Sequence, residues 1–159
     1  MIWKVVDKGK YRGKGKTLPQ IVFDDPDWFF FNFEEGRFAQ WDSELGRQAK
    51  LIEKRARNIK IPKKNPELYE VEYIVDSMSG KFASIQIVDK DRPDHVGSSI
   101  TERKKVIDLR FPRTWKSYDK LGGKILVKSL KYLLFGSQSA RLTKQRCEDF
   151  FDDLNNFVV

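Results

Sequence analysis

Hydrophobic and polar positions along the chain follow several different periods, and each period predicts an element. Residues 2–6 form a short β-branched run, which is typical of a strand. From residue 43 to residue 58, apolar positions recur every three or four residues, which predicts a helix with one face in the core. The predicted core face consists of Trp41, Leu45, Ala49, Ile52, Ala56 and Ile59.

Two shorter helices are predicted before this one. Thr17 is the expected N-cap of the first, and Gln20 three residues later completes a capping box. The second begins with Pro26 and stops at Gly36. Its aromatic run, WFFFNF, is predicted to lie in the core, because each ring buries a large apolar area. A base-stacking platform is the alternative interpretation.

The second half of the chain begins with strand patterns. Apolar and charged residues alternate over residues 69–75, a turn follows at 77–80, and residues 82–88 predict the return strand. Glu70 and Glu72 are expected on one face of the first strand, as carboxylates for metal-dependent chemistry or as a solvated strand face. Residues 89–99 are polar and predict a loop. A third strand is predicted within residues 101–111, with Ile107, Leu109 and Phe111 on one side.

The last part of the chain predicts two helices. The apolar stripe of the first ends at Gly136 and consists of Ile125, Leu126, Leu130, Leu133 and Leu134. A row of Lys124, Lys128 and Lys131 is expected on another face of that helix. Thr143 caps the second helix, whose expected buried side consists of Cys147, Phe150, Phe151, Leu154 and Val158.

These patterns together predict an α+β fold. An N-terminal helical module with a short strand or hairpin precedes a three-stranded antiparallel meander, which packs on the C-terminal helices. The segment KIPKKNPE, with two prolines and three lysines, is the predicted boundary. It separates residues 1–61, with a Gly/Lys loop and the helical module, from residues 67–159, with the meander and C-terminal helices. The two parts form separate domains or pack as one.

The net charge and the low numbers of Cys and His favour some classes of protein and exclude others. The net charge of +8 favours a polyanionic partner, DNA or RNA first. The chain has one Cys and one His, which excludes an intrachain disulfide and a zinc site built from such ligands. No apolar run approaches the ~20 residues of a membrane span, and the start lacks the layout of a signal peptide. We therefore expect a cytoplasmic protein without a membrane partner.

The stretch GKYRGKGKT, residues 9–17, ends like a phosphate-binding Walker loop but does not fit that motif. The motif needs a first glycine at position 10, where this chain has Lys10. Pro19 also removes one amide donor from the first turn of the helix that follows. The sequence therefore argues against a nucleotide triphosphatase.

The alternation of charge in this stretch predicts a different role. In an extended chain every second side chain points the same way, so the charges of the loop would share one side. These residues are Lys8, Lys10, Arg12, Lys14 and Lys16. The prediction is contact with nucleic-acid phosphates, with Tyr11 as a ring on which a base can stack. A second basic row is predicted on the helix at 43–58 and consists of Arg47, Lys50, Lys54 and Arg57. A merely solvated basic turn is the alternative for the loop.

Residues 9–38 resemble a small module found at the C-terminus of exodeoxyribonuclease X-like proteins and in related bacterial and phage proteins. The matching positions are Gly9, Lys10, Tyr11, Arg12, Gly13, Leu18, Asp25, Pro26 and Trp28. The resemblance implies association with DNA-processing proteins and no catalysis, because the exonuclease chemistry of such proteins belongs to a separate acidic domain. The Gly-Lys pair before Thr17 departs from the module and looks like an insertion.

The predicted function is non-catalytic nucleic-acid binding, or an accessory role in DNA processing, through contacts with the phosphate backbone. No catalytic residue, cofactor or metal ligand is assigned. One alternative is a protein–protein adaptor whose basic surface only keeps it in solution. A second is a metal-dependent nuclease using Glu102 and Lys104, in a Glu-x-Lys pattern, with Asp76 or Asp89.

Overall fold

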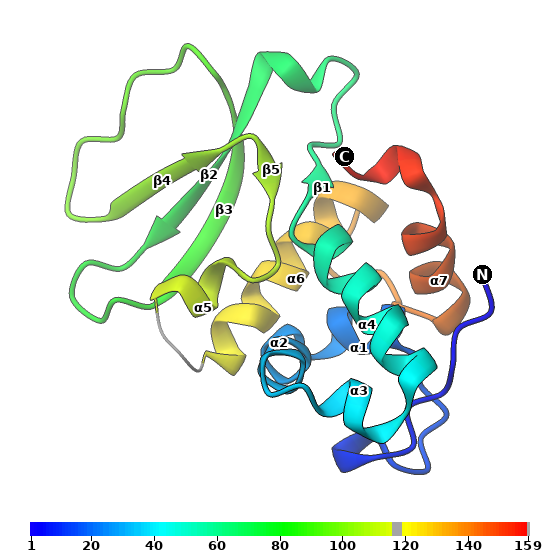
Figure 1. Cartoon of the computed structure of the whole chain (residues 1–159). Helices are drawn as coiled ribbons and strands as arrows, with labels where there is room; N and C mark the ends of the chain where they lie inside the picture. The colour runs from blue at the N-terminus through cyan, green and yellow to red at the C-terminus, as the bar shows by residue number, and fades with distance from the viewer. Residues whose placement is uncertain (116–118, 159) are drawn as a thin grey trace.

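The computed structural model describes residues 1–115 and 119–158 and has an α+β fold, with a sheet at one end and helices at the other (Figure 1). The α-helices are α1 (Leu18–Asp24), α2 (Pro26–Glu34), α3 (Arg37–Trp41), α4 (Ser43–Ala56), α5 (Phe111–Trp115), α6 (Lys120–Phe135) and α7 (Lys144–Asp152). The strands are β1 (Ile59–Lys60), β2 (Tyr69–Val75), β3 (Phe82–Asp89), β4 (Ile100–Lys104) and β5 (Val106–Ile107). Short 3-10 helices are η1 (Gly9–Tyr11), η2 (Pro66–Leu68) and η3 (Leu154–Asn156).

The three-stranded sheet is antiparallel, but its order is β3-β2-β4. The predicted meander is therefore corrected in one respect: the third strand pairs with β2 and not with β3. Polar contacts across the sheet favour this order. Glu72 in β2 accepts hydrogen bonds from Gln86 of β3 at 2.7 Å and from Arg103 of β4 at 2.9 Å. Glu72 is only 2% exposed, so the expected solvated position is also wrong.

The predicted third strand is shorter than expected. β4 ends at Lys104, and the chain then turns so that β5 pairs with β1. Leu109 donates its backbone N–H to the carbonyl of Ala56 at 3.0 Å, which draws this segment onto the end of α4. Phe111 begins α5. Ile107, Leu109 and Phe111 are nevertheless all buried, as predicted.

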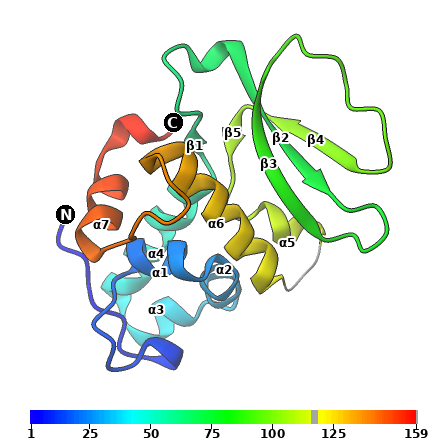
Figure 2. The same cartoon turned by 180° about the vertical axis from the view of Figure 1, so that it is seen from behind.

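One hydrophobic core includes residues from both predicted parts of the chain. Ile52 of α4, Tyr73 of β2, Leu126 of α6 and Phe151 of α7 all belong to it. α1 packs against α7, and α6 packs against β3 and α2 (Figure 2). The division at residues 62–66 therefore falls on a connection between parts that share a core. Their separation into two folding units stays a prediction.

The helix signals in the sequence are largely confirmed. The Asp25 side chain caps α2 by accepting from the backbone N–H of Trp28 at 3.1 Å, and Pro26 is the first residue of that helix. Gly136 ends α6 with a φ of 80°, in the left-handed region that glycine adopts without strain. The Thr143 hydroxyl caps α7. The buried stripe of α4 matches the predicted one from Leu45 to Ala56.

The N-terminal segment differs from its prediction. Residues 2–6 form no strand, and Val5 makes only an isolated bridge with Thr17. Thr17 precedes α1 as predicted, but its hydroxyl donates to Glu148 of α7 at 2.8 Å, so no capping box forms. Gln20 also turns away from the helix end and donates to the carbonyl of Leu142 at 3.5 Å. Tertiary contacts with α7 thus replace the local ones.

The end of the chain is less buried than its period predicts. Cys147, Phe150 and Phe151 lie in the core, as expected. Leu154 and Val158 are 62% and 43% exposed, so their predicted burial is wrong. The reason is that α7 ends at Asp152 and η3 follows, so the helical period does not continue to these residues.

Candidate nucleic-acid interface

The Gly/Lys loop is folded onto the protein and is not extended. Its residues 9–11 form η1, and Gly9, Gly13 and Gly15 have positive φ values of 63°, 74° and 67°. Tyr11 is only 2% exposed. Its hydroxyl donates to Asp24 at 2.7 Å, and its ring packs edge-on against Trp28 with centroids 4.8 Å apart. Burial and the hydrogen bond to Asp24 raise the pKa of this hydroxyl.

The predicted stacking role of Tyr11 is therefore wrong, because the ring is already part of the core. The loop charges also do not share one side. Lys10 donates to Asp25, whose side chain is 4% exposed, and the Nζ of Lys16 lies 3.8 Å from a carboxylate oxygen of Asp24. Both ammonium groups lie close to the Tyr11 ring, at 5.2 and 5.8 Å from its centroid.

Three cations of the loop keep the predicted exposed positions. Lys8, Arg12 and Lys14 are exposed and form no ion pair within the described part of the chain. The loop thus divides into a structural half, which holds α1 and α2 through their acidic residues, and an exposed half. Only the exposed half remains a candidate for phosphate contact.

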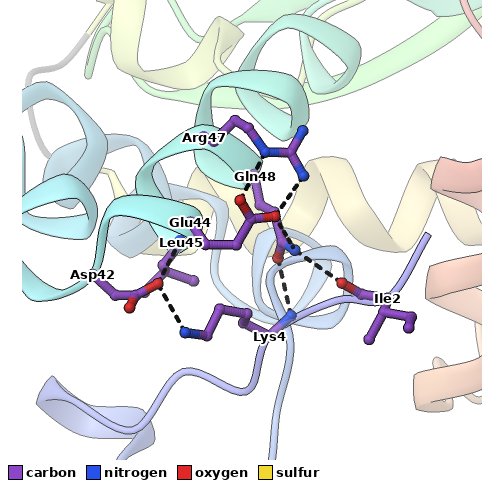
Figure 3. Close-up of polar contacts among 7 residues, drawn as sticks. All are labelled: Ile2, Lys4, Asp42, Glu44, Leu45, Arg47 and Gln48. Carbon is purple, nitrogen blue, oxygen red and sulfur yellow. Dashed lines mark hydrogen bonds and ion pairs between the residues drawn. The ribbon is translucent and has the colours of Figure 1, made fainter.

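The predicted row on α4 is partly neutralised by its own helix. Arg47 donates to Glu44 from Nε at 2.9 Å, a contact drawn in Figure 3. Hydrogen bonding to Arg47 lowers the pKa of Glu44. Arg57 likewise donates to Glu53 at 2.9 Å. Lys50 and Lys54 are exposed on the same face.

The buried face of α4 contacts the N-terminal segment through hydrogen bonds. The buried Gln48 amide donates to the carbonyl of Ile2 at 2.9 Å and accepts from the backbone N–H of Lys4 at 3.0 Å (Figure 3). Lys4 extends its ammonium to Asp42, the N-cap of α4, at 2.9 Å. The hydrogen bond from Lys4 lowers the pKa of Asp42. This part of α4 holds the fold together and offers little free charge.

The basic row on α6 has a different setting. Lys124, Lys128 and Lys131 line a hollow of about 230 Å³ between α6, the end of α1 and the segment before α7. The remaining lining residues are Phe23, Asp24, Val127 and Leu142. Asp24 is the one carboxylate of this hollow among the described residues, and it is already engaged by Tyr11 and Lys16.

The charge of the whole chain is concentrated around α6. Residues 120–147 contain seven of the 31 Lys and Arg residues and none of the 23 Asp and Glu residues, so the rest of the chain is almost neutral. The lysine row on this helix was predicted from the sequence, but no binding role was predicted for it. The net charge summed along the sequence identifies this segment, because residues 120–147 contain no acidic residue. The alternation in residues 8–16 is the more conspicuous pattern, although two of its five cations, Lys10 and Lys16, lie against acidic residues.

The two basic helices face different sides of the molecule. α4 lies in front of α6 in Figure 1, whereas α1 and α6 lie in front in Figure 2. The loop adjoins the α6 side, because Lys16 and the α6 lysines share Asp24 as a neighbour. No ion pair or hydrogen bond of the described residues joins the loop cations to the predicted row on α4, and the segment that contains α6 has the largest excess of positive charge in the sequence. We call Lys124, Lys128 and Lys131 the α6 lysine row.

Comparisons with known proteins identify no relative. Protein-family models, curated proteins and solved structures gave no significant match to the chain. The resemblance of residues 9–38 to the exodeoxyribonuclease-associated module therefore stays a prediction. In the structure, the residues that carry it serve the fold: Tyr11, Asp25 and Trp28 pack or pair with one another and with Lys10.

The acidic residues considered for nuclease chemistry have other partners. Glu102 lies 3.8 Å from the Nζ of Lys104, and Asp76 accepts from Met78 and Ser79 in the turn after β2. Within residues 1–115 and 119–158, no three His, Cys, Asp or Glu side chains are placed to hold a metal ion together. His95 is exposed in the loop between β3 and β4. Among the helices that the structure describes, none has the length and apolar character needed to cross a bilayer.

Proposed function

We propose that the protein binds nucleic acid without catalysis, through contacts between the α6 lysine row and the phosphate backbone. The observation that carries this proposal is the hollow lined by three lysines on a helix that contains no acidic residue. From Lys124 to Lys131 the helix rises by about 10 Å. That length corresponds to about three phosphates of one strand, at about 3.4 Å of axis for each.

The binding energy in this proposal is electrostatic. Lysines that neutralise phosphates release condensed counterions, so affinity falls steeply as salt is added. The side chains of the row lie over the backbone of the ligand and make no base-specific pattern, so sequence preference is weak. Exposed Lys8, Arg12 and Lys14 of the loop, which adjoins the same side, add secondary contacts. We place this activity in the cytoplasm, in keeping with a single Cys.

The experiment compares two variants that remove the same charge from different helices. One carries Lys124→Gln, Lys128→Gln and Lys131→Gln on α6. The control carries Arg47→Gln, Lys50→Gln and Lys54→Gln on α4. Affinity for a labelled duplex is measured by fluorescence anisotropy at several salt concentrations. The α6 variant is expected to flatten the log–log salt slope by about 2.7, which is about 0.9 for each lost phosphate contact.

The control variant is expected to keep nearly the wild-type slope, because the α4 row lies on another face. Equal losses in both variants would mean that total charge matters and the α6 site does not. Absence of binding at low salt, both to this duplex and to a single strand of the same length, would refute nucleic-acid binding altogether. In that case the protein–protein adaptor becomes the better proposal, supported by the exposed apolar side chains Leu121 and Leu154.

A further inference from the structure

Tyr132 of α6 stands apart from the other aromatic residues of the protein. It is 60% exposed, and the next most exposed aromatic side chain in the described residues is Trp115, at 38%. The remaining described rings are buried or half-buried, and many of them pack in pairs. Because most of the Tyr132 side chain is exposed to water, packing in the core does not explain why an aromatic residue is present at this position.

The position of Tyr132 links it to the α6 lysine row. It follows Lys131 directly and lies four residues after Lys128, so the Cβ atoms of Lys128 and Tyr132 are about 5–6 Å apart on the helix surface. Its hydroxyl makes no hydrogen bond with any residue that the structure describes. Within α6 itself there is no carboxylate that would repel a phosphate from this ring.

We infer that the α6 surface binds single-stranded nucleic acid, with a base stacked on Tyr132 while Lys128 and Lys131 hold the adjoining phosphates. This inference rests on the proposed function and specifies its ligand. Every base has a π-face, so stacking is tolerant of sequence, in keeping with the absence of base-reading contacts. The bases of a duplex are already stacked on one another, so the ring finds its partner only in an unpaired strand.

The test uses three labelled ligands of equal length: a single-stranded oligothymidylate, a duplex and an abasic strand that has phosphates and sugars but no bases. Four proteins are compared by anisotropy at low salt: the wild type, Tyr132→Ala, Tyr132→Phe and Leu121→Ala. Leu121 is the matched control, because it lies on the same helix and is 64% exposed but is aliphatic. The melting temperature of each variant is recorded to show that it is folded.

Tyr132→Ala is expected to weaken binding of the oligothymidylate about 5- to 150-fold, as the loss of one stacked base does. Its affinity for the abasic strand and the duplex is expected to change by less than about twofold, because neither ligand offers the ring an unpaired base. Tyr132→Phe retains the ring and is expected to bind like the wild type, and so is Leu121→Ala.

Equal weakening of all three ligands by Tyr132→Ala, or no weakening of any, would overturn the stacking inference. The proposed function would survive that result if the triple lysine variant still loses affinity. A wild-type protein that binds none of the three ligands would instead refute the proposed function. The two failures are therefore distinguishable.

Discussion

The ion pair between Lys10 and Asp25 makes the Gly/Lys loop part of the fold, and replacing Lys10 with Met tests this. The Met side chain retains most of the apolar stem and removes the charge. Asp25 is buried and would keep only its bond from the N–H of Trp28. A hydrogen bond to a charged group contributes about 1.5–3 kcal/mol. Because the Lys10 side chain is 38% exposed, solvent screening reduces this to about 1–2 kcal/mol.

For a domain of this size, 1 kcal/mol shifts the melting temperature by about 2–4 °C, so Lys10→Met is expected to lower it by about 2–8 °C. Thermal and urea unfolding are followed by far-ultraviolet circular dichroism. Lys14→Met is the matched control, because Lys14 is in the same loop and has no ion pair with a described residue. Its stability is expected to stay within about 0.5 kcal/mol of the wild type.

A double-mutant cycle with Asp25→Asn separates the ion pair from other effects. Asn is a good N-cap residue, so this change removes the charge of Asp25 and keeps the cap of α2. The Lys10→Met and Asp25→Asn changes are expected to be non-additive by about 1 kcal/mol, since the second change has no pair left to break. Additive effects, or a Lys10→Met variant as stable as Lys14→Met, would refute the structural role of Lys10.

Three further changes test other parts of the fold. Burial raises the pKa of Glu72, but hydrogen bonds from Gln86 and Arg103 outweigh it and hold the pKa below its ordinary 4.5. The contribution of ionised Glu72 to the free energy of unfolding is therefore present above about pH 4.5 and is lost as the pH falls through the lower pKa of the folded protein. Urea unfolding at several pH values should detect this loss, and the Glu72→Gln variant should not show it. Burial raises the pKa of Cys147 to about 12, so thiol labelling at pH 8 is expected to be slow until denaturant is added; fast labelling of the native protein would contradict this burial. Gly46→Ala places a Cβ 2.7 Å from the backbone of Ala39, so it is expected to destabilise by about 1–3 kcal/mol in thermal unfolding, although alanine favours a helix; a stabilised variant would contradict this packing.

Elements whose ends or pairing are determined by residues close in the sequence are well predicted from the sequence. Pro26 in the first turn of α2 and the glycine at position 136 act within a few residues, so their effect on helix ends does not depend on distant contacts. Alternation in residues 69–75 and 82–88 likewise predicts the β2–β3 hairpin. The α4 stripe is correct because one face of that helix is buried along its whole length.

Features that depend on distant partners could not be predicted in the same way. Thr17 has the local pattern of a capping box, yet its hydroxyl binds Glu148, 131 residues away. Glu72 has the pattern of a solvated strand residue, yet Arg103 and Gln86 enclose it from two other strands. The strand order follows from these cross-strand contacts, which the pattern of residues within a single strand does not predict.

The candidate site was missed for a related reason, which is that charge in the sequence differs from charge in space. The loop at residues 8–16 has five cations, but it folds against an acidic stretch that contains Asp24 and Asp25. Tyr11 has an aromatic ring of the kind on which bases stack, but Gly9 and Gly13 let the backbone turn so that this ring is buried in the core. The α6 lysines form a less conspicuous pattern. Only the folded structure shows that the one described carboxylate in their hollow, Asp24, is already engaged by Tyr11 and Lys16.

The absence of acidic residues from α6 is itself unfavourable for the free protein. Like charges at i, i+4 on a helix destabilise it by about 0.2–0.5 kcal/mol for each pair, and Lys120, Lys124 and Lys128 form two such pairs. Lys120 also lies at the helix N-terminus, where the macrodipole disfavours a cation. On α4 the same problem is relieved by Glu44 and Glu53. Because α6 has no carboxylate of its own and the neighbouring Asp24 is already engaged by Tyr11 and Lys16, an anion from outside the chain would reduce this repulsion, which supports the proposed contact with a phosphate backbone.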